Sequence, residues 1–450
     1  MKCIGLYRLG LSLMAILPFG SLGASEPAKI PANKTPHVVF ISIDDLRPML
    51  GVYGDKVAKT PHLDKLALQG VTFDRAYAQF PICGPSRASV LTGLRPNTVG
   101  VTHNYIKFRD KIPDIVTLPQ YFIQQGYHAA YVGKIFHHGD KDDNNSWNWP
   151  VQHKALKDGT PRPQTYAIAA NRQQQVDNRQ KMVAKYGEQA KYGLGRGPAT
   201  EGADVADNQY IDGFNTDLAI ETIRQMRSAS DKPIFVGFGL HKPHLPWIAP
   251  KKYWDMYNVE DIKQASITAP PLNGASMGLH ASFELRTFAD VPNSEPISAE
   301  LGVKLKHAYL ACVSYIDAQV GRLIESLKQQ GMLDNTIFVV WSDHGYHLGE
   351  MGIWGKASNY EIATRVPLIF STPDTRHRAA GQHSNALVEL VDIYPTLVEL
   401  AGLPMPNALE GKSMAQLLTA PGLPWKPAVF SQFPAPALRE WGAFPLRLME

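Results

Sequence analysis

The stretch Val38-Val39-Phe40-Ile41-Ser42-Ile43-Asp44-Asp45 decides the fold, because six apolar or small residues run directly into two adjacent carboxylates. A short run of this kind, without alternating polar residues, predicts a strand that is buried on both faces. Such strands are typical of parallel sheets with helices on both sides. Since open parallel sheets place their sites at the carboxyl ends of the strands, we expect a functional site to begin at this carboxylate pair.

Four more apolar segments follow along the chain, with helical patterns between them. The predicted strands are Val38–Ile43, Ala129–Val132, Ile234–Gly239, Thr336–Trp341 and Pro367–Ser371. This alternation predicts an α/β fold in which helices flank a large, mostly parallel sheet. At 450 residues, of which 44% are hydrophobic and 19% charged, the chain is long enough for a large core, and its composition excludes intrinsic disorder.

The helices between the strands have readable ends. Thr60 and Thr117 are the expected N-caps of two helices, and Gly70 and Gly126 follow their last turns. A long helix is expected over about Ala299–Gln330. Two other stretches are expected to be loops on the surface. Lys154–Gln209 is polar, and Ala269–Ser298 is interrupted by prolines.

The first residues are typical of a secretory signal peptide. Lys2 and Arg8 are followed by an apolar run over Leu9–Phe19 and by small residues up to Ala24. A membrane span is the alternative, but a span needs about 20 apolar residues and this run has roughly half of them. We therefore expect residues 1–24 to be removed, and the mature protein to be periplasmic or secreted without a transmembrane segment. Loss of Lys2 and Arg8 lowers the net charge from +4 to +2, so nucleic acid is not expected as a partner.

A second polar cluster follows the fourth predicted strand, where Asp343 and His344 precede Gly345. Together with Asp44 and Asp45 it predicts a site for one hard divalent cation, because carboxylates at the ends of two buried strands repel each other without one. Ca²⁺ is favoured over Mg²⁺, since several protein ligands suit its larger shell. Either cluster alone is as readily explained as a turn or a helix cap.

The segment Cys83-Gly84-Pro85-Ser86-Arg87, continued by Thr92-Gly93-Leu94-Arg95-Pro96, has two interpretations. In the structural one, Ser86 is the N-cap of a short helix, Gly93 ends the helix, and Cys83 is a small buried residue. The full pattern, however, resembles the signature of the type I sulfatases. The resemblance implies an alkaline-phosphatase-like fold, and conversion of Cys83 to formylglycine, the nucleophile, by a maturation enzyme.

The resemblance covers nearly all of the mature chain and is closest to the iduronate 2-sulfatase group. The recurring segments are Asp44–Pro48, Gly133–His137, His241–Pro246, Ser342–Gly345, Leu348–Glu350 and Trp354–Lys356. The implied metal ligands are Asp44, Asp45, the modified Cys83, Asp343 and His344. The implied sulfate contacts are Arg87, Lys134, His137, His244 and Lys356.

These residue types suit hydrolysis of a sulfate ester. Negative charge develops on the leaving oxygen as the S–O bond breaks, so fixed cations and a proton donor lower the barrier. In the mechanism implied for the family, one hydroxyl of hydrated formylglycine attacks sulfur, and loss of the proton of the other expels sulfate. We assign His244 as the acid and His137 as the base, since histidine titrates near neutral pH.

Several residues near these segments also have candidate roles. His138, His241 and Lys242 either brace their loops or bind a sugar carboxylate, and Cys312 is expected in the core. Arg47 is a candidate to orient the paired carboxylates. Trp354 is a candidate for stacking on a sugar ring, and Asn104–Arg109 and Lys141–Trp149 are expected rim segments.

The domain prediction is a catalytic domain over 36–425 followed by the start of an incomplete C-terminal subdomain over 426–450. The expected substrate is the 2-O-sulfate of iduronate, or of a related uronate, in glycosaminoglycan fragments. One alternative is another sulfated polysaccharide, or a phosphate ester on the same fold. The other is a non-catalytic truncated homologue that only binds sulfated glycans.

Overall fold

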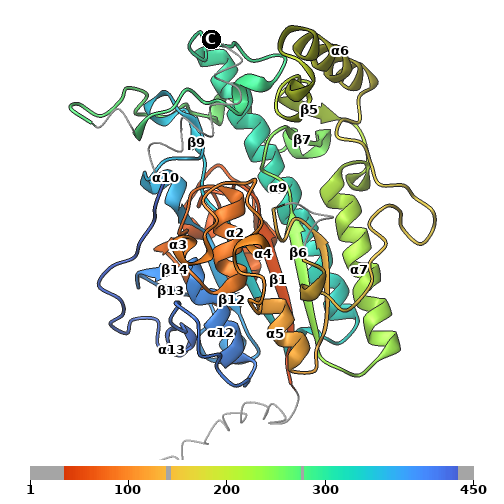
Figure 1. Cartoon of the computed structure of the whole chain (residues 1–450), viewed down its shortest axis with the longest axis vertical. Helices are drawn as coiled ribbons and strands as arrows, with labels where there is room; N and C mark the ends of the chain where they lie inside the picture. The colour runs from red at the N-terminus through yellow and green to blue at the C-terminus, as the bar shows by residue number, and fades with distance from the viewer. Residues whose placement is uncertain (1–34, 138–142, 275–277, 434–450) are drawn as a thin grey trace, which may run out of the picture. The chain divides into compact units, whose positions relative to one another are not determined.

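A seven-stranded sheet runs through the centre of the protein (Figure 1). The computed structural model describes residues 35–137, 143–274 and 278–433. The strand order is β13-β2-β12-β8-β1-β6-β4. These strands are β1 (His37–Ile43), β2 (Val71–Phe73), β4 (His128–Gly133), β6 (Ile234–Leu240), β8 (Thr336–Ser342), β12 (Leu368–Ser371) and β13 (Gln382–Ser384). β8, β1, β6 and β4 are mutually parallel, whereas β12 runs antiparallel to both of its neighbours.

Three smaller sheets accompany the central one. The first consists of β11 (Arg365–Val366), β3 (Ala76–Tyr77) and β14 (Val388–Glu389), the second of β5 (Thr200–Ala203) and β7 (Trp247–Pro250), and the third of β9 (His347–Leu348) and β10 (Trp354–Gly355). β5 and β7 pair in parallel, and β9 and β10 form an antiparallel pair.

Helices cover both faces of the central sheet (Figure 1). One face packs against α1 (Pro61–Ala67), α7 (Ile211–Ala229) and α9 (Ala299–Gln329), and the other against α2 (Cys83–Thr92), α5 (Leu118–Gln124), α12 (Ile393–Leu400) and α13 (Ala415–Thr419). The other helices are α3 (Pro96–Val99), α4 (Phe108–Lys111), α6 (Ala169–Tyr186), α8 (Lys251–Trp254), α10 (Glu361–Thr364) and α11 (Thr375–Arg378).

The central strand β1 shows why its sequence lacks alternation. Val39, Ile41 and Ile43 belong to the core on the α7 and α9 side, while Val38 and Phe40 belong to the core on the α2 and α5 side. Each of these side chains is fully buried. Burying one of them stabilises the fold by about 1.5–3 kcal/mol, so apolar residues are favoured at these five positions.

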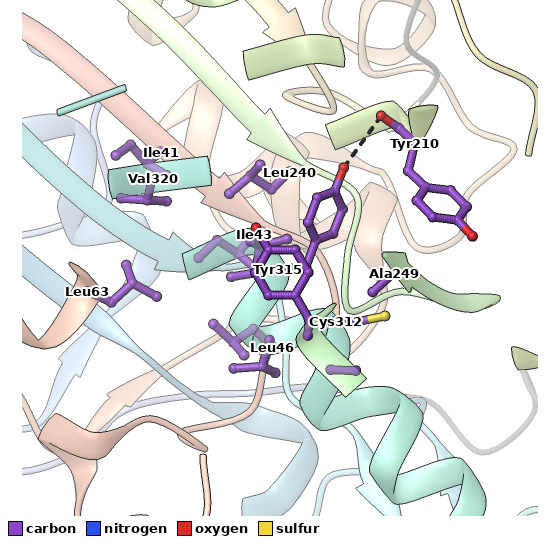
Figure 2. Close-up of a cluster of buried hydrophobic side chains, with 14 of the residues drawn as sticks. Ile41, Ile43, Leu46, Leu63, Tyr210, Leu240, Ala249, Cys312, Tyr315 and Val320 are labelled. Carbon is purple, nitrogen blue, oxygen red and sulfur yellow. Dashed lines mark hydrogen bonds between the residues drawn. The ribbon is translucent and has the colours of Figure 1, made fainter. Parts of the chain in front are cut away.

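Cys312 is a core residue, as predicted. It lies on α9 among apolar side chains from β1, β6 and β7 (Figure 2). Its side chain is fully buried, and its Sγ lies 3.5 Å from Ile248 O. Figure 2 also shows Tyr315 of the same helix, whose hydroxyl donates a hydrogen bond to Tyr210 O at 3.4 Å. Burial raises the pKa of the Cys312 thiol to about 12, so the thiol stays protonated in this core.

All five predicted strands are present with ends within one residue of prediction, and the long helix is confirmed as α9. The Thr117 hydroxyl caps α5 in a reciprocal pair with Gln120. Thr60 stands at the N-cap of α1, but its hydroxyl bonds to Asp64 rather than to the backbone of the helix. Gly70 does not end α1, which stops at Ala67. A Cβ at Gly70 would lie 2.0 Å from Phe370 O, so the glycine permits close approach of β12.

The predictions for two long loops are partly wrong. Lys154–Gln209 contains α6 and β5, and it buries Tyr166 and Glu201. Ala269–Ser298 sends Ser282 and Leu285 into the interior. Both stretches look polar or proline-rich because most of their residues are at least partly exposed, whereas buried side chains such as Tyr166 and Leu285 anchor them.

Two predicted segments lie at the ends of the chain. The expected signal peptide 1–24 and residues 434–450 lie outside the described residues. Among the helices of the described part, none is long and apolar enough to cross a membrane. The segment after position 425 is anchored by Lys426, whose Nζ bonds to Glu389 at 2.7 Å and to Asp392 at 2.6 Å.

Two glycines let the ends of β4 and β6 approach each other. Gly133 has a φ of 80°, and a Cβ there would lie 1.9 Å from Gly239 O. A Cβ at Gly239 would lie 2.2 Å from Lys134 O. Any larger residue at either position would therefore push Lys134 away from the neighbouring strand.

We expect Gly133→Ala to cost about 3 kcal/mol of unfolding free energy, measured by denaturant titration. Two effects contribute to the cost. An alanine is strained in the left-handed backbone conformation, and its Cβ would clash with β6. Gly126→Ala is the matched control, because Gly126 has a φ of 88° but a Cβ there would meet none of the described atoms within 4 Å. It should cost only about 1 kcal/mol. Equal losses in the two variants would contradict the close-approach argument.

Candidate active site

The carboxyl ends of four neighbouring parallel strands meet at one edge of the sheet, in the order β8-β1-β6-β4. The residues singled out from the sequence follow these strands directly: Asp343 and His344, Asp44 and Asp45, His241 to His244, and Lys134. Backbone hydrogen bonds extend the pairing into the site. Asp44 N–H donates to Leu240 O at 3.2 Å, and Lys134 N–H donates to Gly239 O at 3.0 Å. The strand pattern therefore predicted this edge correctly.

Cys83 reaches the same edge from the first turn of α2. The helix begins at Cys83 with Ile82 at the N-cap, so the expectation that Ser86 caps it is wrong. The Ser86 hydroxyl instead donates to Asp343 O at 2.5 Å, which ties α2 to the loop after β8. Gly93 ends the helix in the left-handed conformation, as predicted.

Four buried side chains each bring one metal-ligating atom to within 4.8 Å of the others: Asp44, Asp45, Cys83 and His344. Cys83 Sγ lies 3.2 Å from His344 Nε2 and 3.9 Å from Asp45 Oδ1. Asp343 adjoins the group, since its Oδ1 accepts hydrogen bonds from the backbone N–H of Asp45 at 3.1 Å and of His344 at 3.0 Å. The two carboxylate clusters thus converge, and a divalent cation fits this set of donors.

The ring of His344 is oriented for this purpose. Its Nδ1 lies 2.9 Å from Gly345 O. Because a carbonyl oxygen only accepts hydrogen bonds, Nδ1 carries the proton, and Nε2 directs its lone pair toward Cys83 and Asp45. A hydrogen bond from one imidazole nitrogen to a backbone carbonyl is the usual way to orient the other as a ligand.

Arg87 is fully buried beside this group. Its Nε donates to Asp343 Oδ2 at 2.8 Å, and its Nη2 lies 3.4 Å from Asp44 Oδ1. Its Nη1 donates to the carbonyls of Lys134 at 2.5 Å and Ile135 at 2.9 Å. All three nitrogens therefore contact groups of the protein, and Arg87 is the counter-charge of two carboxylates. Its contact with sulfate stays a prediction.

Two lysines provide the other counter-charges, and both are buried. Lys134 Nζ pairs with Asp44 Oδ2. Lys356, directly after β10, places Nζ 2.9 and 3.0 Å from the two carboxylate oxygens of Asp45, and 3.5 Å from Cys83 Sγ. Positive charge therefore stands next to Cys83.

The protonation of Cys83 and Asp44 follows from these contacts. Burial and the charge of Asp44 raise the pKa of the Cys83 thiol well above its ordinary value, although Lys134 and Lys356 oppose the rise. Burial would also raise the pKa of Asp44, but Lys134, His244 and Arg87 hold it well below its ordinary value. Asp44 is therefore an ionised carboxylate, whereas an unmodified Cys83 is a neutral thiol and a poor nucleophile.

His244 faces a carboxylate that the sequence pattern does not single out. Its Nδ1 lies 2.7 Å from Leu245 O, and its Nε2 lies 3.2 Å from Glu284 Oε1. Glu284 belongs to the stretch Ala269–Ser298, for which a surface position was expected. A single glutamate in a proline-rich loop has neither periodicity nor a motif around it, so only its tertiary contacts reveal it.

His241 and Lys242 brace the loop after β6. Their backbone N–H groups donate to the two oxygens of Asp212, each at 2.8 Å. Lys242 Nζ donates to the carbonyls of His244 and Pro246, each at 2.6 Å. Of the two interpretations left open for these residues, the contacts favour bracing.

Arg47 acts on the carboxylate pair only indirectly. Its Nη1 pairs with Glu350 Oε1 at 2.8 Å. Its backbone N–H donates to the Tyr309 hydroxyl at 3.1 Å, and that hydroxyl donates to Asp45 O at 2.9 Å. The expectation that the Arg47 side chain itself orients the carboxylates is therefore wrong.

Trp354 is not available to stack on a sugar, contrary to expectation. It is 5% exposed and packs against Trp247, with ring centroids 6.3 Å apart. The expected rim segment Asn104–Arg109 does lie near α2, since Gly84 N–H donates to Asn104 Oδ1 at 2.8 Å. Tyr105 on this segment is 76% exposed.

His137 lies in the segment that follows Lys134, four residues after the end of β4. Its role as a base stays a prediction. His138 lies outside the described residues, as do the first two residues of the expected rim segment Lys141–Trp149.

Comparison with known proteins identifies the family of the chain. The profile of the Sulfatase family matches residues 36–403. The chain is 32% identical over 497 residues to iduronate 2-sulfatase from Homo sapiens. The alignment covers 98% of this chain and 85% of that protein. It is also 32% identical over 397 residues to a sulfatase from Formosa agariphila, covering 85% of this chain and 72% of that protein.

The chain belongs to the sulfatase family. Among solved structures, this sulfatase is similar to a phosphonate monoester hydrolase from Silicibacter pomeroyi, with a TM-score of 0.65 and 25% sequence identity, over 88% of this chain and 79% of that one. The match supports the α/β fold predicted from the strand pattern and the alkaline-phosphatase-like architecture implied by the Cys83 segment.

Arg87 offers a direct test of charge compensation in this sulfatase. We expect Arg87→Met to lower the unfolding free energy by about 3–5 kcal/mol in metal-free buffer, because Asp44 and Asp343 would stay buried without their counter-charge. Arg322→Met is the control, since its pair with Asp217 is partly exposed, with side chains 38% and 23% exposed. It should lose about 1 kcal/mol or less. Similar losses in both variants would show that Arg87 does not compensate the carboxylates.

Proposed function

We propose that this sulfatase is an exported hydrolase of sulfate monoesters that uses formylglycine, made from Cys83, and a divalent cation. The observation that carries the proposal is the position of Cys83 Sγ, 3.2 Å from His344 Nε2 and 3.5 Å from Lys356 Nζ. The nucleophile position thus adjoins both the cation ligands and a fixed positive charge. The proposed ligands are Asp44, Asp45, the modified Cys83, Asp343 and His344.

The cation is proposed to be Ca²⁺ rather than Mg²⁺. The ligand atoms come from buried side chains, so several protein oxygens and little water would surround the ion, which suits calcium. Once bound, the cation would stabilise negative charge on the sulfate, and the hydrated formylglycine would provide the attacking hydroxyl.

The chain's own residues prepare the rest of the reaction. Lys134 pairs with Asp44 and Lys356 pairs with Asp45, and Lys356 adds positive charge where the sulfate oxygens would lie. His244 Nδ1 donates a hydrogen bond to Leu245 O, and its Nε2 faces Oε1 of Glu284, which also contacts Lys356 through its other oxygen. We propose His244 as the donor of a proton to the leaving sugar oxygen and His137 as the base.

The proposed substrate is the 2-O-sulfate of iduronate, or of a related uronate, in glycosaminoglycan fragments. Support comes from the similarity to human iduronate 2-sulfatase over 98% of this chain. A sulfatase for another sulfated polysaccharide is the second candidate, because the Formosa agariphila sulfatase is equally identical at 32%. Similarity to the phosphonate monoester hydrolase keeps a phosphate-ester substrate as an alternative. The non-catalytic homologue is the remaining one.

Modification of Cys83 is tested by mass spectrometry of the peptide that contains it. After expression with a formylglycine-generating enzyme, the peptide should have exchanged the thiol for an aldehyde or its hydrate. Cys83→Ala, expressed alongside, should lose at least about 10³-fold in kcat, because no nucleophile remains. Detection of thiol alone in an active protein would refute the proposed nucleophile, and thiol in an inactive protein would favour the non-catalytic homologue.

Substrate preference is tested by sulfate release from defined mono- and disaccharides. We expect 2-sulfated uronates to be hydrolysed with the highest kcat/KM. A panel with 4- or 6-sulfated hexosamines and a phosphate monoester provides the comparison. Hydrolysis of hexosamine sulfates alone would overturn the uronate proposal while leaving the sulfatase activity intact.

Cation binding is tested by thermal unfolding with Ca²⁺ and with EDTA. We expect Ca²⁺ at about 100 times its Kd to stabilise the protein by about 2.7 kcal/mol. Asp45→Asn should remove most of this difference, because it deletes a ligand charge. Asp255→Asn, which changes a carboxylate directly after α8 whose side chain is 56% exposed, should keep it. If Ca²⁺ increased the stability of both variants by the same amount, the cation would bind at another site.

A further inference from the structure

The loop between residues 278 and 288 holds the segment around Lys356 through a hydrogen bond to Trp354, a hydrogen bond to Lys356 O and an ion pair with Lys356 Nζ. Trp354 N–H donates to Ser282 Oγ at 2.8 Å. His280 Nε2 lies 2.5 Å from Lys356 O, and Ser282 N–H donates to His280 Nδ1 at 3.1 Å. Because Nδ1 accepts a hydrogen bond, Nε2 carries the ring proton and donates it to Lys356 O. The loop thus fixes the backbone on which Lys356 stands.

The third contact comes from Glu284, which reaches two cationic side chains at once. Its Oε2 lies 3.2 Å from Lys356 Nζ, and its Oε1 lies 3.2 Å from His244 Nε2. Arg196 Nη1 lies 3.7 Å from the same Oε1. The Glu284 side chain is only 16% exposed, so solvent screens these interactions weakly.

Without this carboxylate, Lys356 and a protonated His244 would repel each other. Burial, and next the charge of Lys356, lower the pKa of His244, whereas Asp45 and Glu284 act in the opposite direction. Burial would raise the pKa of Glu284, but Lys356, His244 and Arg196 hold it well below its ordinary value. Glu284 is therefore ionised throughout the neutral range and available as a counter-charge.

Both nitrogens of the His244 ring face acceptors. Nδ1 faces Leu245 O, and Nε2 faces Glu284 Oε1. This is the arrangement that suits an imidazolium, in which each nitrogen donates a proton. An acid catalyst must hold its proton until the leaving group needs it, and Glu284 is the group that faces the Nε2 position.

We propose that Glu284 is a positioning residue that keeps His244 and Lys356 side by side, with a proton on His244 Nε2, for delivery to the leaving oxygen. The inference rests on the proposed function and extends it to a residue outside the sulfatase motifs of the sequence. As the S–O bond breaks, its electron pair stays on the leaving oxygen, and the Nε2 proton joins that oxygen. Glu284 itself remains ionised and unchanged.

The test compares Glu284→Gln with wild type on two aryl sulfates, phenyl sulfate and 4-nitrophenyl sulfate. Gln keeps the size of the side chain but removes its charge. Phenol is a poor leaving group that needs a proton, whereas 4-nitrophenolate leaves readily without one. We expect kcat for phenyl sulfate to fall about 100-fold, the lower end of the range for general acid catalysis, and kcat for 4-nitrophenyl sulfate to fall less than about threefold.

Glu295→Gln is the matched control, because it removes the same charge from an exposed position of the same proline-rich stretch. It should leave both rates unchanged. Equal losses on the two substrates in Glu284→Gln, or no loss on either, would overturn the proposal, since a merely structural role does not depend on the leaving group.

A crystal structure of Glu284→Gln gives a second readout that does not require turnover. We expect the His244 ring and the Lys356 ammonium to move apart, whereas Glu295→Gln should keep both in place. Unchanged positions in Glu284→Gln would overturn the proposal even if neither aryl sulfate is a substrate. Inactivity of the matured wild type on every sulfate ester would instead contradict the proposed function.

Discussion

The structure depends on the burial of three carboxyl groups at the carboxyl edge of the sheet. Asp44, Asp45 and Asp343 are at most 1% exposed, and an isolated buried charge costs several kcal/mol. Three buried cations make this burial possible. Arg87 contacts Asp343 and Asp44, Lys134 contacts Asp44, and Lys356 contacts Asp45. Each of these cations comes from a different part of the chain, so the site and the fold are stabilised by the same contacts.

The backbone around the site lets neighbouring strands approach each other closely. Gly133 and Gly239 let β4 and β6 meet so that Lys134 extends toward Asp44. Asp45 adopts a φ of 64°, a left-handed conformation that aspartate tolerates better than most residues. Its N–H bonds to Asp343, so the turn after β1 is held by the strand beside it. The geometry of the ligand cluster is thus set by strand pairing, before any cation is considered.

A second group of charged residues lies next to Lys356. There, Glu284 joins Lys356 and His244, and the loop that carries it also holds the backbone of Lys356 through His280. Neighbouring cations repel one another. The Glu284 carboxylate lies between Lys356 and His244 and reduces that repulsion, which explains why an acidic residue stands among these cations.

Local sequence alone determined the apolar strands, the ends of several helices and the two polar clusters after β1 and β8, because buried parallel strands need unbroken apolar runs and their ends share one edge. The Cys83 segment likewise carried its resemblance in adjacent residues. Only the tertiary structure decided the place of Glu284, the burial of Trp354 and the partner of the Arg47 side chain. These depend on contacts between residues far apart in the chain, and the energy of such a contact comes from desolvation and charge pairing, which no local pattern records.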